Sequence, residues 1–521
     1  MTATTPRPAT PTTIDWGQTW PTLPEFRALA AERRVIPVAR RLLADVTPVG
    51  LYRTLAQGRP GTFVLESAEV DGTWARYSFV GVNSRATLTV RDRRATWTGD
   101  VPVGVPTEGD DPVEVLAETL RVLRTPAIPG LPPLTGGLVG ALGWDVVRYW
   151  EPTLPTRAPE ELGVPELTLC LATDLAVVDH VDGSVWLIAN AINFDDTDAR
   201  VDEAWTDAVV RLDAMERGLI EPASAGAAVL IDALEPQIEF RSTQAEFETA
   251  VRAGKVAIRD GEVFQVVLSQ RLDLACPATP LDVYRVLRTI NPSPYMYYLQ
   301  LQDADGADFA IVGSSPETLV KIADGRVTTY PIAGSRPRGA SPEEDHELAI
   351  ELLADPKERA EHIMLVDLSR NDLAKVCAPD SVEVVEFMQV RRFSHIMHIC
   401  STVVGRLHEG STAVQTLKAT FPAGTLSGAP KPRAIALIDE LEPARRGIYG
   451  GTVGYFDFAG NMDLAITIRT AMIRAGRATV QAGAGIVADS VPELEYQESR
   501  NKAAAAVRAV QIAARLRTAG C

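Results

Sequence analysis

The sequence predicts an α+β fold in which antiparallel β-sheets are covered by helices. Two patterns indicate this class: short β-rich runs bounded by turn signals recur along the first half, and strand pairs alternate with single helices in the second half. The composition of the 521 residues, 46% hydrophobic and 23% charged, excludes a wholly disordered chain. At this length we expect roughly two to four domains or one large compound domain.

The chain begins with a segment that has no apolar core. Met1–Thr13 is rich in Thr, Pro and Ala, so we expect residues 1–15 to be a flexible tail rather than a signal peptide. The small-residue segment Gly218–Gly226 is the predicted linker. It separates an N-terminal region (16–225) from a C-terminal region (240–515).

Local patterns place the expected elements in order. Runs of β-branched and apolar residues bounded by Gly, Asn or Asp predict strands, and apolar residues at helical spacing predict helices. The expected elements are strands at Trp74–Val82 and Leu167–Val178, with turns at Asp71-Gly72 and Asp182-Gly183, then a strand within Gly261–Leu274, a helix at Asp282–Ile290, a strand at Val327–Ile332, and a hairpin of Thr452–Phe458 with Asp463–Ile473 around Gly460-Asn461.

Three helix starts in the second half carry capping signals. Ser341-Pro342-Glu343-Glu344 combines a capping hydroxyl, Pro at the first helical position and an acid at the third. Asp355-Pro356-Lys357-Glu358 repeats this pattern, and Ser490-Val491-Pro492-Glu493 is a third instance. The Ala-rich stretch Lys502–Ala519 carries three Arg residues, which predicts a packed helix rather than a membrane segment.

Charge and cysteine usage limit the partners and the compartment. The chain has 51 Lys+Arg and 68 Asp+Glu, a net charge of −17, which disfavours nucleic acid and anionic membranes as partners. Small anionic substrates remain open, because a local Arg can dominate a pocket. The cysteines are odd in number, scattered and without a C-x-x-C pair, which predicts a reduced cytoplasmic protein; they are Cys170, Cys276, Cys377, Cys400 and Cys521.

Two predicted helices carry paired carboxylates. Glu358 and Glu361 are spaced i, i+3, as are Glu495 and Glu498, so each pair lies on one helical face. Together they could hold a hard divalent cation such as Mg²⁺, which prefers oxygen ligands. The alternatives are solvated helix faces and, for Glu358, a capping box with Asp355.

Two glycine-rich segments and one arginine are candidate anion-binding groups. Gly424–Lys431 and Gln481–Gly485, which follows a strand, are predicted loops whose backbone amides could meet an anion; tight turns are the alternative. Neither matches a nucleotide-binding motif. Arg469 lies in a near-continuous apolar strand, so we expect it to pair either with a structural acid or with a substrate carboxylate.

Two histidines flank an apolar stretch. His395 and His398 do not have the H-E-x-x-H spacing of a zinc site. Either could act as a general acid or base near neutral pH, although a hydrogen-bonded core histidine is the commoner outcome.

Taken together, these motifs resemble a known family. The matching stretches are VLES (64–67), PIAGSRPRG (331–339), ERAEHIMLVDLSRNDL (358–373), SHIMHI (394–399), GTLSGAPKPRA (424–434), RGIYGGTVGY (446–455) and QAGAGIVADSVPELEYQESRNKA (481–503). From about residue 50 onward the chain resembles the chorismate-utilising enzymes, and among them the anthranilate synthase large subunits (component I). The resemblance implies their fold, in which antiparallel sheets pack together inside a layer of outer helices.

The resemblance also implies a reaction and a metal. Ammonia adds at C2 of chorismate, the C4 hydroxyl leaves, and pyruvate is then eliminated to give anthranilate, the first committed step of tryptophan biosynthesis. Mg²⁺ holds the ring carboxylate in this family, and Glu361 and Glu498 match its ligands. Glu358 and Glu495 match residues that meet the metal through water or support its ligands.

Individual roles are carried over residue by residue. Glu317 resembles the general acid for the departing hydroxyl, and His398 resembles the histidine near the reacting ring. Arg469 and Tyr449 match residues that hold the enolpyruvyl carboxylate. The implied substrate-binding set is Gly334, Ser335 (often Thr in the family), Thr425, Tyr449, Arg469, Gly483, Ala484 and Gly485.

Two positions distinguish this chain from its relatives. Isochorismate and salicylate synthases resemble one another in a Lys that activates water, whereas this chain has Gln265, which cannot deprotonate water. Aminodeoxychorismate synthases of the well-known type have a nucleophilic Lys where this chain has Ala333. Ammonia-dependent amination at C2 is therefore favoured; aminodeoxyisochorismate, isochorismate and salicylate synthases remain the alternatives.

The resemblance implies partners and regulation as well. The five cysteines lack the context of an amidotransferase nucleophile, so a separate glutamine amidotransferase subunit is expected to supply ammonia in a heterotetramer of two large and two small subunits. L-tryptophan is the expected feedback inhibitor; a catalytically inactive tryptophan-binding regulator is the alternative from another class. The implied inhibitor site consists of Glu66, Ser67, Pro294, Tyr295, Met296, Val453 and Tyr455.

Overall fold

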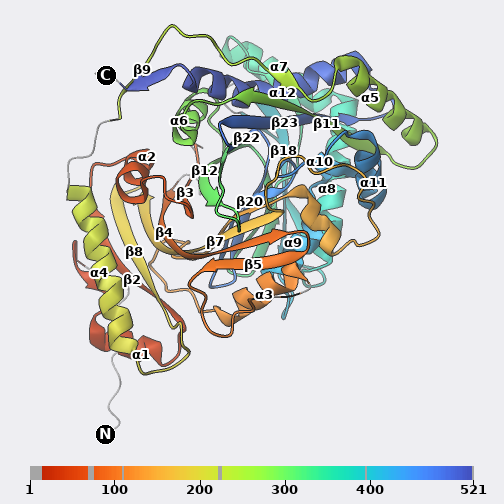
Figure 1. The fold of residues 1–521 in the computed structure, drawn as a ribbon. Coiled ribbons are helices and arrows are strands. Elements are labelled where there is room, and N and C mark those ends of the chain that lie inside the picture. Colours follow the sequence, from red (N-terminus) through yellow and green to blue (C-terminus); the bar gives the residue numbers. More distant parts are fainter. Residues whose placement is uncertain are drawn as a thin grey trace.

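Antiparallel strands form the centre of the molecule, and helices lie around them (Figure 1). The computed structural model describes residues 15–68, 76–107, 109, 111–220, 226–392 and 396–518. The predicted α+β class is confirmed.

The strands and helices have the following bounds. The strands are β1 (Thr19–Trp20), β2 (Val35–Leu43), β3 (Thr62–Glu66), β4 (Tyr77–Arg91), β5 (Arg94–Gly99), β6 (Gly137–Leu142), β7 (Leu167–Asp179), β8 (Ser184–Ile192), β9 (Ala228–Leu230), β10 (Glu239–Phe240), β11 (Gln265–Ala275), β12 (Tyr295–Gln302), β13 (Asp308–Ser315), β14 (Thr318–Ala323), β15 (Arg326–Thr329), β16 (Ile332–Pro337), β17 (Glu383–Arg392), β18 (Ile396–Arg406), β19 (Gly428–Ala429), β20 (Thr452–Asp457), β21 (Met462–Ile466), β22 (Thr470–Arg474), β23 (Arg477–Ile486) and β24 (Leu516–Thr518). The α-helices are α1 (Leu23–Ala30), α2 (Pro48–Leu51), α3 (Pro112–Val122), α4 (Val201–Ile220), α5 (Gln244–Arg259), α6 (Pro280–Ile290), α7 (Pro342–Ala354), α8 (Pro356–Ala374), α9 (Ala413–Thr420), α10 (Gly424–Ser427), α11 (Lys431–Leu441) and α12 (Pro492–Ala513).

Strands from both halves of the chain join one sheet system. Of the strands in the described residues, 22 form a continuous hydrogen-bonded network, and β9 and β24 pair apart from it. β3 pairs antiparallel with β12, and β6 pairs antiparallel with β20, so residues near the N-terminus are held directly against the C-terminal half. The division of the chain at the predicted linker stays a prediction.

An apolar layer lies between strands of the two halves. It includes Phe63 and Val139 from the first half and Tyr297, Leu299 and Val453 from the second, each almost fully buried. Burial of side chains of this size stabilises the fold by roughly 1.5–3 kcal/mol each. This core fixes the strands that carry the residues discussed below.

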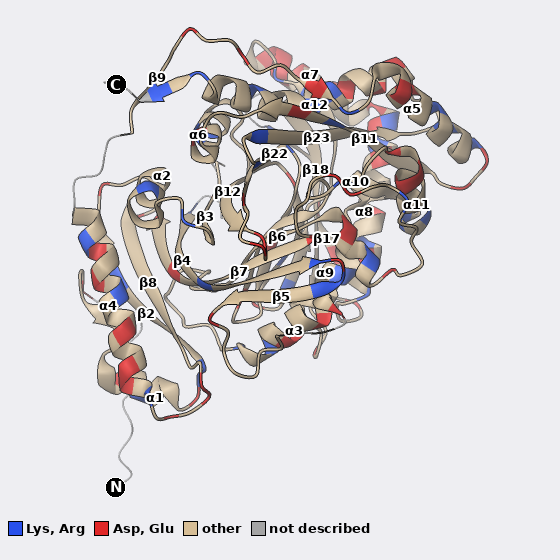
Figure 2. Cartoon of the chain, viewed as in Figure 1, with Lys and Arg blue, Asp and Glu red and all other residues tan. Residues whose placement is uncertain are grey.

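Helices cover the outer faces of the sheets. The small residues Ala503 and Ala506 of α12 let this helix lie close to β23, where they pack with Val480 and Ala482. Figure 2 shows the consequence for charge: Lys, Arg, Asp and Glu lie mainly on the outer helices and loops, whereas the inner strands carry few of them.

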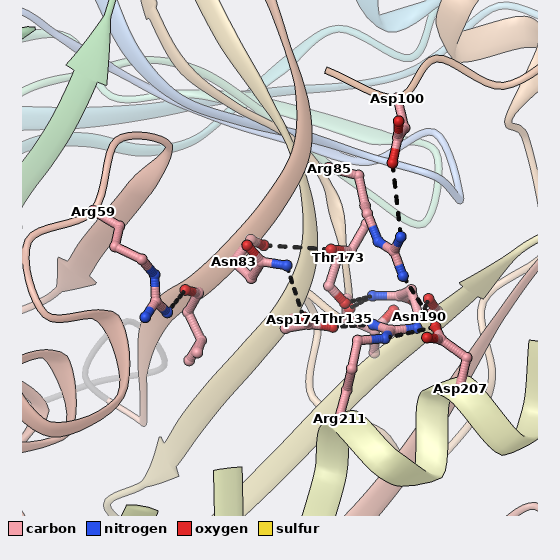
Figure 3. A network of polar contacts seen from close by, with 11 residues as sticks. Arg59, Asn83, Arg85, Asp100, Thr135, Thr173, Asp174, Asn190, Asp207 and Arg211 are labelled. Carbon is pink, nitrogen blue, oxygen red and sulfur yellow. Dashed lines mark hydrogen bonds and ion pairs between the residues drawn. The ribbon is translucent and has the colours of Figure 1, made fainter. Parts of the chain in front are cut away.

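A polar network holds α4 against its sheet (Figure 3). The Arg211 guanidinium pairs with Asp174 of β7, donates to Asp207 (2.9 Å) and donates to the Asn190 carbonyl of β8 (2.9 Å). Arg85 of β4 reaches Asp207 as well, at 3.0 Å. We call Arg85, Asp174, Asn190, Asp207 and Arg211 the Arg211 network.

Several predicted helices are confirmed. α6 covers Asp282–Ile290, and Ser341 and Asp355 cap α7 and α8 through side-chain oxygens that accept backbone N–H bonds. The third cap is wrong. Val491 precedes α12, and the Ser490 hydroxyl accepts from the Val487 amide instead.

Several other predicted elements are also wrong. The predicted loop Gly424–Lys431 contains α10 and β19, and the strand predicted at Val327–Ile332 is interrupted between β15 and β16. The helix predicted to reach Ala519 ends at Ala513, because Leu516–Thr518 pairs with β9 as a strand. The strand predicted over Asp463–Ile473 is two strands, since the backbone of Thr467 pairs with Gly450 and Gly451 and turns the chain out of the ladder. Gln481–Gly485 is not a loop but lies within β23, paired with β11.

Some predictions fall on residues outside the described ranges. These are most of the N-terminal tail, the Asp71-Gly72 turn with the start of the Trp74–Val82 strand, the centre of the linker, Cys521 and His395. Among the residues that are described, no helix is both long and apolar enough to cross a membrane.

Candidate active site

Arg469 lies at the break between β21 and β22. Its backbone is left-handed, with a φ of 50°, a conformation that is uncommon for a residue with a long side chain and is typical of functional sites. Burial lowers the pKa of its guanidinium, and Glu317 partly offsets that effect. Within the described chain the guanidinium forms no ion pair or hydrogen bond. It is therefore available to an anionic group from outside the protein.

The glycines of β23 lie beside Gln265 and Tyr449. Gly483 pairs with Ser269 and Gly485 with Val267, so both are strand residues. A Cβ at Gly485 would lie 2.5 Å from the Gln265 side-chain nitrogen, and the Gly483 backbone hydrogen-bonds the Tyr449 hydroxyl. The lack of a side chain at Gly485 lets the Gln265 amide lie directly against the strand.

Glu317 is a partly buried carboxyl group between β13 and β14. Thr425, at the start of α10, donates its hydroxyl to Oε1 of Glu317 at 2.9 Å. Burial raises the Glu317 pKa to about 7, although Thr425, Lys502 and Arg469 all lower it. A carboxyl group with this pKa can give a proton at neutral pH.

His398 is oriented by a bulge at Gly334. The register of β16 against β18 shifts between Ala333 and Ser335, which places Ser335 opposite His398. Nδ1 of His398 lies 2.9 Å from the Gly334 carbonyl and donates to it, so Nε2 carries the lone pair. Burial lowers the His398 pKa to about 4, which keeps the ring neutral.

The structure brings the paired carboxylates of α8 and α12 together. Burial raises the Glu361 pKa, and the charges of Glu358 and Glu498 raise it further. The pKa values of Glu358 and Glu495 are also raised by burial, and Glu498 adds to both. The Glu358 carboxylate lies beside Gly334, where a Cβ would come within 3.0 Å of Oε2. Asp355 alone caps the helix, so Glu358 does not close a capping box.

This donor set fits a hard divalent cation. The candidate ligand atoms are all carboxylate oxygens. Their negative charges repel one another, and a bound cation would offset this repulsion. Across the described residues, no three His, Cys, Asp or Glu side chains form a ready-made metal cluster. Two protein carboxylates with waters and substrate oxygens is the arrangement that Mg²⁺ commonly adopts.

Two features of the site were not predicted from the sequence. Lys502 pairs with Glu498 at 2.7 Å, and its charge also acts on Glu317, Glu361 and His398. The i, i+4 spacing of Glu498 and Lys502 on one helix was the available signal. The second feature is a buried ion pair between Glu442 and Arg446, the first residue of the motif at 446–455.

That ion pair supports the strands beneath the site. Arg446 and Glu442 are 1% and 4% exposed and lie 2.6 Å apart. Arg446 donates to the carbonyls of Leu426 and Val267, and Glu442 accepts from the Ser269 amide. The pair therefore fixes α10 against β11, the strand that carries Gln265.

The predicted inhibitor residues also lie together, at the ends of β3 and β12. Glu66 is opposite Met296 in the ladder, and the Ala68 amide donates to the Ser293 carbonyl, which places Ser67 beside the segment that leads into Pro294. Further members of the set meet at Asp463, which accepts from the Tyr295 hydroxyl at 2.9 Å and pairs in register with Tyr455, two residues after Val453.

Glu66 already has partners within the protein. Arg288 donates to both carboxylate oxygens, at 2.9 and 3.1 Å, and the Tyr284 hydroxyl donates to Oε1. Neither partner was predicted from the sequence, because both lie on α6, more than 200 positions from Glu66.

Comparisons with known proteins support the resemblance. The family model described as chorismate binding enzyme matches residues 63–508. The chain is 59% identical over 507 residues to anthranilate synthase component 1 of Arthrobacter globiformis, covering 96% of this chain and 95% of that protein. It is 54% identical over 494 residues to the component 1 of Mycolicibacterium smegmatis, covering 94% of each. The crystal structure of anthranilate synthase component I from Streptococcus pneumoniae superposes with a TM-score of 0.73 at 36% identity, covering 85% of this chain and 94% of that one.

Proposed function

The chain belongs to the chorismate-binding enzyme family, and from this premise we propose that it is the large, chorismate-converting subunit of an anthranilate synthase. The observation that carries the proposal is the convergence of Glu361 and Glu498 from two helices, in a site that also holds Arg469, His398 and Glu317. Each of these groups is charged or titratable and is positioned by backbone geometry.

The residues have complementary roles toward chorismate, a dicarboxylate. Arg469, with Tyr449 and the backbone of Gly483 to Gly485, holds the enolpyruvyl carboxylate. Gly334, Ser335 and Thr425 line the ring, and Ala484 completes the strand beneath it. Glu317 gives its proton to the C4 hydroxyl as that group leaves, and its pKa of about 7 suits this task.

Nitrogen enters at C2 without a protein base. The side-chain amide of Gln265 lies against Gly485 and is neutral. It can orient ammonia by hydrogen bonding, but it cannot remove a proton from water. This favours amination over the formation of isochorismate or salicylate. The neutral His398 ring, with its lone pair on Nε2, is placed to accept a proton when pyruvate is eliminated.

Glu361 and Glu498 would hold Mg²⁺, with Glu358 and Glu495 outside the first ligand shell. When bound, the ion would supply Lewis-acid polarisation of the ring carboxylate. The all-oxygen donor set described above supports this assignment.

Ammonia is supplied by a separate glutamine amidotransferase subunit, in a cytoplasmic heterotetramer. The cysteines of the described chain support this, because all four are buried and burial raises the pKa of Cys170 to about 12 and of Cys276 and Cys377 to about 11. Thiols of this kind are poor nucleophiles. L-tryptophan inhibits the enzyme from the site that contains Glu66, Ser67 and Tyr295.

One product assay tests the function. The purified chain with chorismate, Mg²⁺ and ammonium is expected to form fluorescent anthranilate, and glutamine in place of ammonium is expected to give none. Accumulation of aminodeoxyisochorismate, isochorismate or salicylate would contradict the assignment to anthranilate. Turnover with glutamine by the isolated chain would contradict the separate amidotransferase.

A further inference from the structure

A small chamber lies behind Glu317. Its walls are both apolar, with Leu365 and Leu368 of α8 among them, and polar, with Ser369 and Asp372 among them. It offers about 50 Å³ to the centres of water-sized molecules. One ordered water needs roughly 10–15 Å³ by this measure, so the chamber can hold a short file of waters.

Of the described residues assigned to the candidate active site, two border the chamber. Glu317 and Thr425 line it, whereas Gly334, His398 and Arg469 do not. The Glu317 carboxyl group therefore belongs both to the candidate active site and to the wall of this second space. Because Thr425 holds only Oε1, the other carboxylate oxygen can accept a separate partner.

Asp372, which also lines the chamber, is paired with two lysines. It pairs with Lys431 at 2.7 Å and with Lys375 at 2.9 Å, and the Lys375 side chain is 60% exposed. Chamber waters can thus exchange with solvent near this cluster of charges.

A buried hydroxyl points independently to water in the chamber. Thr329 of β15 lines the chamber, is 6% exposed, and its Oγ1 has no hydrogen-bond partner in the described chain. A polar group buried without a partner costs roughly 1–3 kcal/mol. A chamber water would remove that cost.

We propose that this chamber is a water and proton passage that connects Glu317 to solvent at Asp372. The inference rests on the proposed function. It assigns new roles to Thr329 and Ser369, which position the chamber waters and do not touch the substrate.

The reaction requires such a passage because each turnover leaves Glu317 one proton short. The nitrogen lone pair forms the C2–N bond, the ring π electrons shift, and the C4–O bond breaks with its electron pair on oxygen. The Glu317 proton converts that oxygen to water, and the added nitrogen releases one proton to solvent. The chamber carries the product water away and returns a proton to the Glu317 carboxylate.

Filling the chamber tests the proposal. Ser369→Leu, assayed as the full chain with chorismate, Mg²⁺ and ammonium, is expected to lower kcat at least tenfold with an unchanged KM for chorismate. The solvent deuterium isotope effect on kcat is expected to rise, because proton return becomes limiting. The matched control is Asn371→Leu, which adds the same side chain at an exposed position of the same helix and is expected to behave as the parent protein.

A second variant keeps the test decisive if Ser369→Leu does not fold. Thr329→Val removes the hydroxyl at constant volume and is expected to lower kcat threefold to tenfold with the same rise in the isotope effect. Parental kcat and isotope effect in a folded Ser369→Leu or Thr329→Val variant would overturn the passage. Failure of the parent chain to form anthranilate would overturn the proposed function instead, so the two failures are distinguishable.

Discussion

The Arg211 network and the candidate active site differ in how their charges are satisfied. Cavities of about 700 and 730 Å³ flank Arg211, far more space than the chamber behind Glu317 offers. Yet Arg211 has a partner for each side of its guanidinium (Figure 3). Arg469 has none within the described chain, and Glu361 forms no ion pair or hydrogen bond there either.

The comparison predicts that charge without a partner, more than open volume, marks a ligand-binding site in this chain. A charged side chain that is shielded from water and has no partner destabilises the folded state. Such groups persist where an external ligand supplies the partner. The charges that the Arg211 network contributes to the walls of the wide cavities are already paired with one another, so this network needs no ligand.

Removal of a candidate metal ligand is expected to have the largest effect. Glu498→Gln or Glu361→Gln should lower kcat/KM for chorismate roughly 1,000-fold or more, because Lewis-acid stabilisation is worth several kcal/mol. Glu495→Gln, which leaves both proposed ligands in place, should cost only about 10- to 100-fold. Steady-state anthranilate formation and calorimetric titration with Mg²⁺ measure these effects.

Equal losses of kcat/KM in the Glu495 and Glu498 variants would contradict the assignment of Glu498, but not Glu495, as a metal ligand. A Glu361→Gln variant that retained parental Mg²⁺ affinity would remove Glu361 from the ion.

A paired substitution of the two arginines tests the comparison directly. Arg469→Met should lower kcat/KM at least ~30-fold, since truncation of one partner of a desolvated charge pair costs about 2–5 kcal/mol, while stability is kept. Arg211→Met should leave kcat/KM unchanged but lower the unfolding free energy by about 3–5 kcal/mol, because Asp174 loses its partner. Urea denaturation and steady-state kinetics separate the two outcomes.

The opposite pattern, in which Arg469→Met destabilises the chain and Arg211→Met impairs turnover, would show that pairing does not distinguish structural from functional charges here.

Glu317 links the comparison to pH. Its folded pKa of about 7 exceeds its ordinary value of 4.5, so the folded chain keeps the proton that the unfolded chain releases between those values. Stability therefore falls as pH rises from about 4.5 to 7. Glu317→Gln should gain up to about 3 kcal/mol of unfolding free energy relative to the parent between pH 4.5 and pH 8.

The same group controls turnover. Since the protonated carboxyl is the proton donor, kcat at fixed free ammonia should decline above about pH 7, and this limb should vanish in Glu317→Gln. An unshifted stability difference across this pH range would place the Glu317 pKa near its ordinary value.

The sequence allowed much of this to be predicted, and the exceptions have physical causes. α6, α7 and α8 follow local apolar spacing and capping, which a single segment encodes. The break at Arg469 could not be predicted, because the backbone partners of Thr467 lie on another part of the chain. The same holds for Gln481–Gly485, which only its pairing with β11 makes a strand.

The candidate site shows the same limit. Its residues could be named through the family resemblance, whereas the supporting pair of Arg446 and Glu442 could not, because burial of an i, i+4 ion pair depends on tertiary packing. The partners of Glu66 were missed for the same reason, since α6 meets β3 only in the folded chain.

Substitutions in the proposed inhibitor site have the smallest expected effect. They also test the comparison between charges that have partners within the protein and charges that do not. Glu66 is a satisfied charge, held by Arg288 and Tyr284, so by the argument above it contributes to stability as well as to any ligand. Ser67, next to it, is the better test: Ser67→Phe should place a bulky ring in the proposed inhibitor site and raise the tryptophan concentration for half-inhibition at least tenfold, about 1.4 kcal/mol. Its kcat and KM without tryptophan should match those of the parent.

Glu66 supports both the fold and the proposed inhibitor site. Glu66→Gln should therefore weaken inhibition only together with a loss of unfolding free energy, whereas Ser67→Phe should weaken inhibition alone. Parental tryptophan sensitivity in Ser67→Phe would remove this residue from the inhibitor site.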